Sequence, residues 1–423
     1  MEHYAIVVIG SGSGNTILDE DFADRRAAII DSGAFGGTCL NVGCIPTKMF
    51  VLPADFASSP SEAARVGVDL QFRGASFASI RDRIFGRIDS ISKAGLSYRQ
   101  GLDNIDVYTG EAAFIDAHTL EVGGRCITAD QIVLAAGSRP RVPDLDDSSM
   151  AGLIHTSDTI MRLAELPQRL VILGGGLIAA EFAHIFSGLG SQVTVINRSG
   201  RMLRHEDREI SQRFTEQMGR RVRLRMVEGL VGVDRDPGGH LVVLTVDSDG
   251  VDYDYPADVV LNATGRVSNG DRLNLPAAGV DVDDDGFVVV DKHQRTNVEH
   301  IWALGDVCSP WELKHVANHE ARVVRHNLLH PDDLAVLIIA SCRTRCFRIR
   351  RWRRLVPRSR DCCNPTLLTR RTFRSTRTSP MGGPWRTRGT ASSCWEIRRR
   401  GLCWGRTSLG AKRPPSFRPV FRG

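Results

Sequence analysis

Two cysteines, Cys39 and Cys44, are the residues of this 423-residue sequence best placed to do chemistry. They lie five positions apart in the run Gly36-Gly37-Thr38-Cys39-Leu40-Asn41-Val42-Gly43-Cys44-Ile45-Pro46-Thr47-Lys48. A disulfide needs Cα atoms roughly 4.4–6.8 Å apart, whereas an undistorted helix holds positions i and i+5 farther apart and about 140° round its axis. A bridge therefore predicts a bent or irregular turn, which Gly43 makes less costly.

A strained, accessible dithiol pair is of the labile, catalytic kind. Two other interpretations are open at this point, a pair of free cysteines and half of a zinc site. A zinc site would call for a shorter hook and a second hook downstream. The residues on either side of the pair must decide between these interpretations.

The N-terminal segment predicts a dinucleotide-binding turn. The apolar run Tyr4–Ile9 is followed by Gly10-Ser11-Gly12-Ser13-Gly14-Asn15, which indicates a strand, a tight turn and the start of a helix. Such glycines let a pyrophosphate approach backbone N–H groups. Asn15 replaces the third glycine, so we expect the helix to pack slightly farther from the strand. A second short strand, 27–30, ends at Asp31, where an acid is expected to bind the ribose hydroxyls.

A second copy of this pattern follows the run Leu170–Leu173, where small residues fill the three expected positions at Gly174, Gly176 and Ala179. The next strand, 192–196, ends in Asn197 and Arg198 instead of an acid, and Arg204 follows six residues later. Arginines bind a 2′-phosphate through bidentate, charge-assisted hydrogen bonds, whereas an acid would repel it. The second site is therefore predicted to prefer NADPH, the alternative being that these arginines are ordinary surface residues.

Two dinucleotide folds with a dithiol at the first indicate two cofactors and electron transfer between them. Three further motifs are Ala135-Ala136-Gly137, Ala263-Thr264-Gly265 and Ala303-Leu304-Gly305-Asp306. With these, the sequence resembles the pyridine nucleotide–disulfide oxidoreductases, the class of glutathione reductase and lipoamide dehydrogenase. Within that class it resembles the mycothione reductase group most, through the dithiol run and the segments 155–159, 265–269 and 313–322. The resemblance runs from residue 1 to about 336 and then stops.

The resemblance implies an α/β fold of the glutathione reductase type, with two Rossmann-like domains that bind FAD and NADPH. Electrons would pass from NADPH through FAD and Cys39–Cys44 to a low-molecular-weight disulfide, mycothione. Cys39 would attack the substrate, Cys44 would lie against the flavin, and Lys48 would sit beside the flavin and pair with Glu181; the alternative is that Lys48 and Glu181 are solvated. No metal is implied. The implied cofactor contacts are Gly10, Gly12, Gly14, Asp31, Thr38, Lys48, the backbone of Ala112, Gly137, Gly174, Gly176, Ala179, Glu181, Arg198, Arg204, Gly265, Gly305 and Asp306.

The chain divides by pattern into an FAD-binding domain in two parts, 1–150 and 266–335, an NADPH-binding domain, 151–265, and a tail, 336–423. A helix is expected over 76–100, with Ile80, Ile84, Ile88 and Ile91 in the core, and another over 312–329. Residues 103–134 are expected to form a small antiparallel insertion. The N-terminus lacks a signal-peptide pattern, and no apolar run reaches the roughly 20 residues of a membrane span. A reactive dithiol among scattered cysteines fits a cytosolic protein.

The tail has a different composition from the rest of the chain. Residues 341–423 hold 23 Lys and Arg against 2 Asp and Glu, whereas residues 1–340 hold 32 against 47. Leu, Ile, Val and Phe number only 13 in those 83 residues, too few to build a core. The sequence therefore predicts a disordered basic tail, and nucleic-acid or membrane-surface binding is the functional interpretation of its charge.

A shift of reading frame after about residue 336 is the preferred interpretation of this tail, because shifted GC-rich codons yield Arg, Pro, Gly, Cys and Trp. Back-translated with suitable codons, residues 342–355 can read one frame over as Val-Pro-Asp-Ala-Val-Phe-Pro-Asp-Pro-Gln-Val-Ala-Ala, which resembles the start of the family's dimerisation domain. In the family, that domain forms the homodimer and supplies a His–Glu acid to the partner subunit. His330-Pro331 does not match that motif.

The chain as written is thus predicted to keep the flavin, NADPH and dithiol sites without the acid, and its disulfide reductase activity to be impaired. Other functions left open are a lipoamide dehydrogenase or glutathione reductase-like enzyme and a diaphorase-like fragment. A nucleic-acid-binding protein is a remote alternative.

Overall fold

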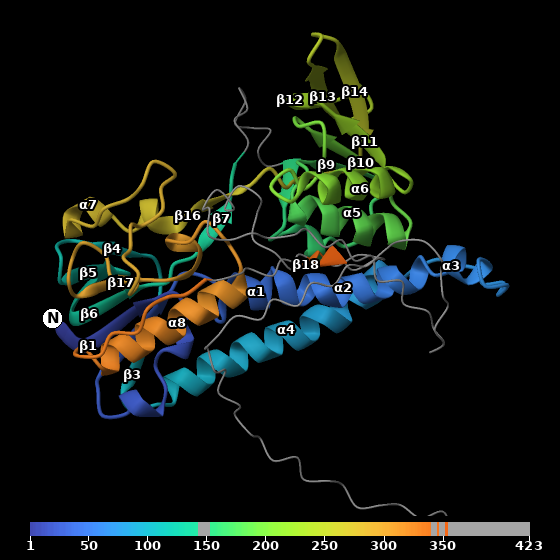
Figure 1. Cartoon of the computed structure of the whole chain (residues 1–423). Coiled ribbons are helices and arrows are strands. Elements are labelled where there is room, and N and C mark those ends of the chain that lie inside the picture. Colours follow the sequence, from blue (N-terminus) through green and yellow to red (C-terminus); the bar gives the residue numbers. More distant parts are fainter. Residues whose placement is uncertain (143–152, 340–344, 347–351, 354–423) are drawn as a thin grey trace, which may run out of the picture. The chain divides into compact units, whose positions relative to one another are not determined.

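A mostly parallel sheet carries the N-terminal part of the chain in the computed structural model, which describes residues 1–142, 153–339, 345–346 and 352–353. Its strand order is β3-β2-β1-β6-β5-β4, and β17 pairs with β6 (Figure 1). β1 runs parallel to β2 and β6, and its Val7 and Val8 are fully buried, as expected for a strand covered on both faces. The strands are β1 (Glu2–Ile9), β2 (Ala27–Asp31), β3 (Ile105–Thr109), β4 (Ala112–Phe114), β5 (Thr119–Val122), β6 (Arg125–Leu134) and β17 (Ile301–Ala303).

The prediction of an antiparallel insertion over 103–134 is wrong for two of its strands. β3 pairs with β2 in parallel, and β6 pairs in parallel with both β1 and β17. Only β4, β5 and the first half of β6 form an antiparallel meander. The end of β6, residues 132–134, is completely buried. An unbroken apolar run of this kind is typical of a central parallel strand, whereas the frequent turns around it suggested a hairpin.

The helix expected after the first glycine turn is also absent from the described chain. Two short 3-10 turns, η1 (Gly14–Thr16) and η2 (Glu20–Phe22), occupy its place. The reason is local, because polar side chains in this segment bond to nearby backbone groups and compete with helix formation. The Thr16 hydroxyl donates to Ser13 O at 2.7 Å, and the Asp19 carboxylate accepts the N–H of Asp21 at 3.2 Å.

The second sheet contains only parallel strands, in the order β11-β10-β9-β15-β8. Here the expected helix does follow the glycine turn, as α5. A three-stranded antiparallel sheet, β12-β13-β14, continues the chain beyond β11 (Figure 1). These elements are β8 (Ile154–Thr156), β9 (Arg169–Leu173), α5 (Leu177–Leu189), β10 (Gln192–Asn197), α6 (Arg208–Gly219), β11 (Arg223–Met226), β12 (Glu228–Arg235), β13 (Leu241–Asp247), β14 (Asp252–Ala257) and β15 (Val259–Asn262).

The predicted helix over 76–100 is confirmed as α4 (Phe77–Gln100), which Ser76 caps by accepting the N–H of Ser79. Its core stripe is only partly as expected. Ile84 and Ile88 are fully buried, but Ile91 is 46% exposed. Buried positions on this helix recur every four residues, so the position that follows Ile88 on the inward face is 92 and not 91. Ser92 fills that position, and its hydroxyl donates to Phe35 O at 2.7 Å.

The remaining helices place the site residues. α8 begins at Lys314, close to its predicted start, and packs Ala321, Val324 and Leu328 against the first sheet. α2 packs against both α4 and α5. The remaining elements are α1 (Gly37–Asn41), α2 (Cys44–Ala57), α3 (Pro60–Ala64), β7 (Ser138–Pro140), η4 (Ile160–Arg162), β16 (Arg266–Ser268), η5 (Asn269–Arg272), α7 (Leu275–Ala278), η6 (Gly305–Val307), α8 (Lys314–Leu329), β18 (Arg345–Cys346) and β19 (Trp352–Arg353).

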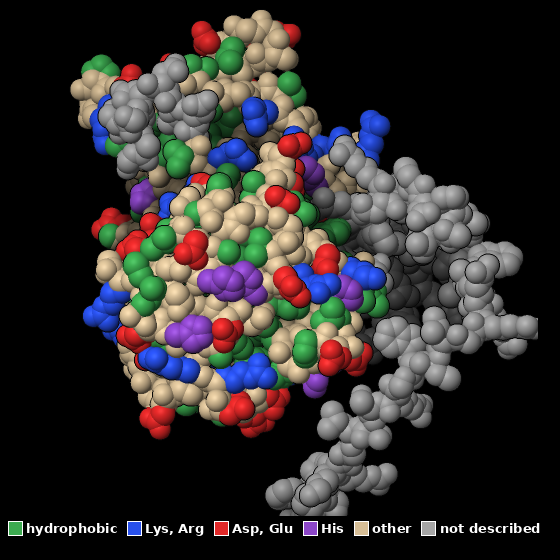
Figure 2. All heavy atoms as spheres, turned by 90° about the vertical axis from the view of Figure 1, so that its left-hand side faces the viewer, with side chains coloured by type: hydrophobic (Ala, Val, Ile, Leu, Met, Phe, Trp, Pro, Cys, Tyr) green, Lys and Arg blue, Asp and Glu red, His purple; other side chains and the backbone are tan. Residues whose placement is uncertain are grey.

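The predicted fold class, α/β with two dinucleotide-binding sheets, is confirmed by this arrangement. The exact domain limits stay a prediction, and the tail expected over 336–423 lies almost wholly outside the described residues. Within the described part of the chain, no helix is long and apolar enough to cross a membrane. Figure 2 shows acidic and basic side chains intermixed on one face of the molecule.

Candidate redox site and nucleotide turns

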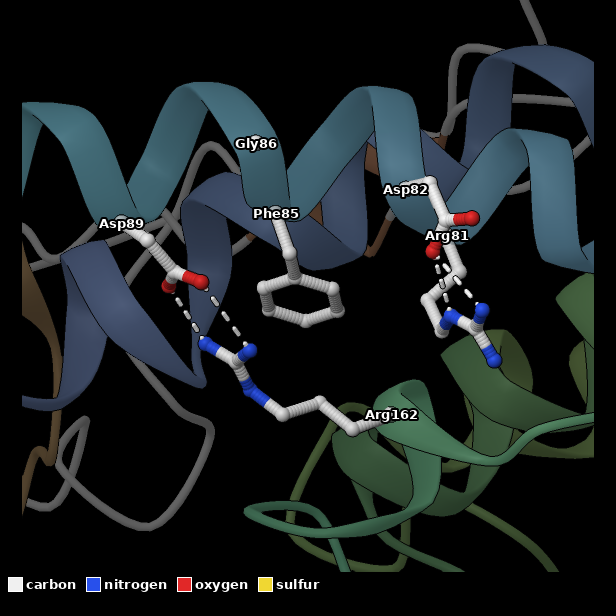
Figure 3. Close-up of a pocket in the computed structure, with 6 residues that line it drawn as sticks. All are labelled: Arg81, Asp82, Phe85, Gly86, Asp89 and Arg162. Atoms are coloured by element: carbon white, nitrogen blue, oxygen red, sulfur yellow. Dashed lines mark hydrogen bonds and ion pairs between the residues drawn. The ribbon is translucent and has the colours of Figure 1, made fainter.

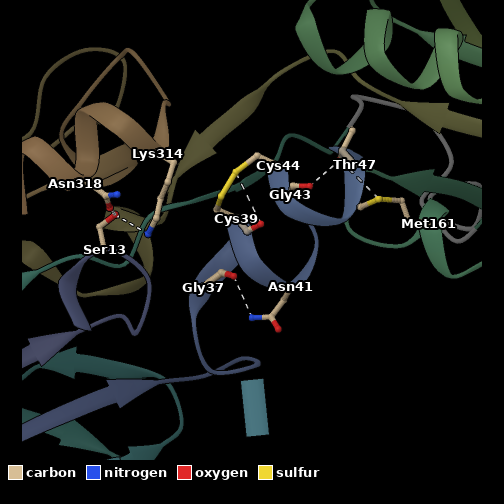
Figure 4. The surroundings of a disulfide bond; sticks show 10 residues. All are labelled: Ser13, Gly37, Cys39, Asn41, Gly43, Cys44, Thr47, Met161, Lys314 and Asn318. Carbon is tan, nitrogen blue, oxygen red and sulfur yellow. Dashed lines mark hydrogen bonds between the residues drawn. A yellow bond between two sulfur atoms is a disulfide. The ribbon is translucent and has the colours of Figure 1, made fainter. Parts of the chain in front are cut away.

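The two cysteines of the opening motif form a disulfide, with Cα atoms 4.9 Å apart (Figure 4). Cys39 lies in α1 and Cys44 is the first residue of α2, so the bridge spans the break between two helices. The predicted irregular turn is therefore confirmed. Gly43 has an ordinary φ of −118°, so it is needed for space. A Cβ there would lie 2.8 Å from Thr38 O and 3.0 Å from the Cα of Cys39.

Asn41 holds the loop that precedes the disulfide, a role that the sequence analysis did not identify. Its buried amide donates to Ala34 O at 2.9 Å and to Phe35 O and Gly37 O at 3.1 Å. On the other side of the break, the Thr47 hydroxyl donates to Gly43 O at 2.7 Å. A short helix that carries an asparagine next to a glycine-rich loop is the sequence signal that could have pointed to Asn41.

The first glycine turn lies directly against the dithiol segment. A Cβ on Gly37 would be 2.6 Å from the Cα of Gly12, so only two glycines allow the backbones to approach this closely. Gly10 has a φ of +111°, and a Cβ there would lie 2.2 Å from Ala135 O. The turn therefore offers a backbone surface without side chains, which fits the pyrophosphate of a dinucleotide. Thr38 is exposed beside this turn.

Asp31 ends β2 at the same turn. Its carboxylate accepts the N–H and the hydroxyl of Ser11 at 2.7 and 2.5 Å, and the N–H of Gly33 at 2.8 Å. The acid predicted to hold a ribose thus lies at the glycine turn. Ala112, the other contact implied within this sheet, is buried in β4.

A second group of predicted residues meets near η6. The Ser138 hydroxyl, next to Gly137, donates to the Asp306 carboxylate at 2.7 Å. The N–H of Gly305 donates to the Glu320 carboxylate at 2.7 Å. Glu320 is 2% exposed, and this burial raises its pKa. The sequence analysis did not identify Glu320, although it lies inside the quoted α8 motif.

The second glycine turn repeats the geometry of the first. Gly174 has a φ of +111°, and a Cβ there would lie 2.4 Å from Ala263 O. Behind it, Gly176 precedes α5, in which Ala179 is fully buried. Gly265 follows Ala263 by two residues, and its carbonyl accepts the N–H of Arg141 at 3.0 Å.

Asn197 organises the loop that carries the two predicted arginines. Its amide donates to Ser199 O at 2.9 Å and to Arg201 O at 3.2 Å. Both Arg198 and Arg204 are exposed on this loop. Exposed guanidinium groups next to a nucleotide turn are able to bind a phosphate, so the geometry is compatible with the predicted role.

Lys48 and Glu181 lie on α2 and α5, the two helices that pack together. Lys48 is exposed and Glu181 is half-buried. The ion pair between them stays a prediction. A polar network does join the same helices, because His184 on α5 lies with its Nε2 2.9 Å from the Asp55 carboxylate on α2. Arg221 donates to the other ring nitrogen, His184 Nδ1, at 2.8 Å.

The partners of His184 determine its protonation. Arginine has only donors, so Nδ1 must accept and Nε2 must carry the proton that it donates to Asp55. Arg221 also donates to the Ser58 hydroxyl at 2.9 Å. The helix that begins at Cys44 is thereby fixed to the helix that begins behind the second glycine turn.

A separate surface cavity of about 380 Å³ lies between α4 and η4 (Figure 3). Arg162 pairs there with Asp89 at 2.7 Å and stacks 3.8 Å from the centre of the Phe85 ring. The pairing with Arg162 lowers the pKa of Asp89. Arg81 pairs with Asp82 at 2.7 Å. The lining charges therefore balance, and the cavity shares no residue with the dithiol motif.

Comparison with known proteins identifies the family. The sequence pattern of the pyridine nucleotide-disulphide oxidoreductases matches residues 4–321. The chain belongs to this family. Mycothione reductase of Mycobacterium tuberculosis is 50% identical to it over 335 residues, which cover 78% of this chain and 72% of that protein. Dihydrolipoyl dehydrogenase of Chlamydia trachomatis is 32% identical over 340 residues, which cover 79% and 72%.

A solved structure supports the same family assignment. The HOCl-induced flavoprotein disulfide reductase RclA from Escherichia coli matches with a TM-score of 0.72 at 27% identity, over 82% of this chain and 76% of that one. The predicted family and fold type, and the use of a flavin with a pyridine nucleotide, are confirmed at this level. The chain is a flavoprotein disulfide reductase with a redox disulfide at Cys39–Cys44. Within its described residues, no group of three or more His, Cys, Asp or Glu side chains is arranged to hold a metal ion.

Proposed function

We propose that this oxidoreductase reduces mycothione, a low-molecular-weight disulfide, at the expense of NADPH. The observation that carries the proposal is the Cys39–Cys44 disulfide, which a glycine-to-glycine contact holds against the first nucleotide turn. The 50% identity to a mycothione reductase supports the substrate. Asp31, Asp306 and the first glycine turn would hold FAD, and the second turn would hold the nicotinamide nucleotide.

When bound, FAD and NADPH supply the two electrons that open the Cys39–Cys44 bond. The Cys39 thiolate then attacks one sulfur of the substrate, forms a mixed disulfide and releases the first thiolate, which takes up a proton. Cys44 attacks the Cys39 sulfur, releases the second thiol and restores the original bond. Cys44 is suited to carry negative charge between these steps, because it begins a 14-residue helix whose N-terminus stabilises a thiolate.

Nucleotide selectivity is assigned to the arginines after β10. Replacing both Arg198 and Arg204 by Ala should raise the KM for NADPH at least about tenfold and leave that for NADH nearly unchanged, because each charge-assisted hydrogen bond to phosphate contributes roughly 1.5–3 kcal/mol. The double substitution Arg83→Ala and Arg87→Ala, on the exposed face of α4, removes the same charge elsewhere and is the control. Unchanged selectivity in the first variant would contradict the assignment.

The substrate is tested by steady-state assays with mycothione, lipoamide and glutathione disulfide, each with NADPH and with NADH. We expect the highest kcat/KM with mycothione and NADPH. A higher value with lipoamide and NADH would instead assign the chain to the dihydrolipoyl dehydrogenases, to which it is also similar.

A further inference from the structure

The first nucleotide turn lacks the structural feature that usually carries positive potential to a bound pyrophosphate. In dinucleotide-binding folds, the helix behind the glycines contributes a partial positive charge at its N-terminus. Behind Gly10–Gly14 the chain forms only three-residue 3-10 turns, whereas a 13-residue helix stands behind the second turn. FAD therefore needs another source of charge at the first turn.

A lysine from a distant part of the sequence reaches this turn. Lys314 is the first residue of α8, and its Nζ donates to the Ser13 hydroxyl at 3.0 Å. Ser13 is 8% exposed, and its hydroxyl donates in turn to Asn318 Oδ1 at 3.0 Å. Figure 4 shows the side chains of Lys314 and Asn318 converging on Ser13.

This ammonium is half-buried and without a carboxylate partner in the part of the chain that the structure describes. Ser13 is its one hydrogen-bond acceptor there, so two of its three N–H groups are available to a ligand. Burial lowers the pKa of Lys314, while the charge of Asp306 acts in the opposite direction. A cation held in this state is costly to the empty protein and is stabilised when an anion binds beside it.

A second cation holds the turn in its position. Arg99, near the end of α4, donates to Asn15 Oδ1 at 2.8 Å, to Asn15 O at 2.7 Å and to Leu18 O at 2.6 Å. All three acceptors are neutral. Burial lowers the pKa of this half-buried guanidinium, while the charge of Asp19 acts in the opposite direction. Because each of its three nitrogens donates to this segment, Arg99 is a positioning residue, and Lys314, which uses one of its three donors, is the group that would contact a ligand.

We propose that the Lys314 ammonium binds the pyrophosphate of FAD at the first glycine turn and takes the place of the absent helix N-terminus. Arg99 fixes the turn and adds positive potential behind it. This inference rests on the assignment of FAD to the first turn. The glycine motif alone does not indicate the contact, because Lys314 lies 301 residues after Ser13 in the sequence.

The test compares the wild-type apoprotein with Lys314→Met, Lys314→Arg and, as the matched control, Lys93→Met on the exposed surface of α4. Dissociation constants for FAD are measured by fluorescence titration, and the unfolding temperature of each apoprotein is recorded. We expect Lys314→Met to weaken FAD binding at least about tenfold, Lys314→Arg to restore most of the affinity, and Lys93→Met to match wild type. The apoprotein of Lys314→Met should unfold at the same temperature as wild type or higher, because a buried charge has been removed.

Phosphorus NMR of bound FAD identifies the contact. The pyrophosphate resonances should shift between wild type and Lys314→Met. Affinity within twofold of wild type, unchanged phosphorus resonances, or a loss of apoprotein stability that accounts for the weaker binding would each overturn the proposal. Failure of the wild-type chain to bind FAD would instead contradict the cofactor assignment itself.

Discussion

The two glycine turns of this protein have the same backbone geometry but different elements behind them. Gly10 and Gly174 share a φ of +111°, and a Cβ on either would overlap a carbonyl oxygen at the end of a neighbouring strand, Ala135 O or Ala263 O. The second turn leads into α5, whereas the first leads into two 3-10 turns, and Arg99 from the distant helix α4 holds the first of these through Asn15. A glycine pattern thus specifies the backbone cradle and leaves the element behind it unspecified.

The largest effect on activity is expected from the tail, where the predicted frameshift removes the family's His–Glu acid. Both nucleotide turns lie before the tail and should be unaffected by it. The chain as written should bind both nucleotides and deliver electrons to an artificial acceptor. We predict that it reduces a physiological disulfide at less than about one per cent of the rate of a chain whose reading frame is restored after about residue 336, since general acid help contributes about 10²–10⁴-fold. Both activities and the size of each protein in solution are measured side by side.

A chain that ends at residue 339 is the control and should behave like the chain as written. Full disulfide reductase activity in the chain as written would refute the frameshift interpretation, because the basic tail would then have to replace the family's dimerisation domain.

The next effect separates the two turns directly. Gly10→Ala should abolish FAD binding, and Gly174→Ala should abolish NADPH binding while FAD still binds. Each should also lower the free energy of unfolding by more than about 2 kcal/mol, because a left-handed residue costs about 1–2 kcal/mol and overpacking adds about 1–3 kcal/mol. Urea unfolding and calorimetric titration with each nucleotide measure these effects.

Gly124→Ala isolates the backbone contribution to this loss. Gly124 has a φ of +78° with open space around its Cβ position, so only the strain of the left-handed conformation applies. If Gly10→Ala costs no more stability than Gly124→Ala, the close approach to Ala135 O is not what requires glycine at the first turn.

The sequence predicted those parts of the site that depend on short-range spacing. The strands before both turns, the disulfide and its helix break, the position of Asp31 and the long α4 all follow from local patterns. Arg99, Lys314 and Glu320 were missed in these structural roles because they act on residues that are distant in sequence, and no periodicity records such contacts. The helix behind the first turn was predicted wrongly, because the glycine motif implied a helix where Asn15, Thr16 and Asp19 make side-chain bonds instead.

The smallest effect is expected from Glu320, a buried carboxylate that belongs to the predicted FAD site. It accepts the N–H of Gly305. Its pKa is raised from the ordinary 4.5, chiefly by burial, with a smaller contribution from the charge of Asp306. Below pH 4.5 the carboxyl is protonated in both the folded and the unfolded protein. As the pH rises through the raised pKa of the folded state, the folded protein must ionise a buried group, and this contribution to stability is lost. Glu320→Gln keeps an oxygen acceptor for Gly305 and cannot ionise.

The variant should therefore become progressively more stable relative to wild type as the pH rises from 4.5 through the raised pKa of the folded state, and more stable by a constant amount above it, on the order of 1 kcal/mol. Urea unfolding at a series of pH values measures this difference. Glu299→Gln removes an exposed carboxylate from the same part of the chain and controls for net charge. A stability difference between wild type and Glu320→Gln that stays constant with pH would mean that the buried carboxylate is stabilised as fully as in water. The hydrogen bond from Gly305 would then compensate for its burial.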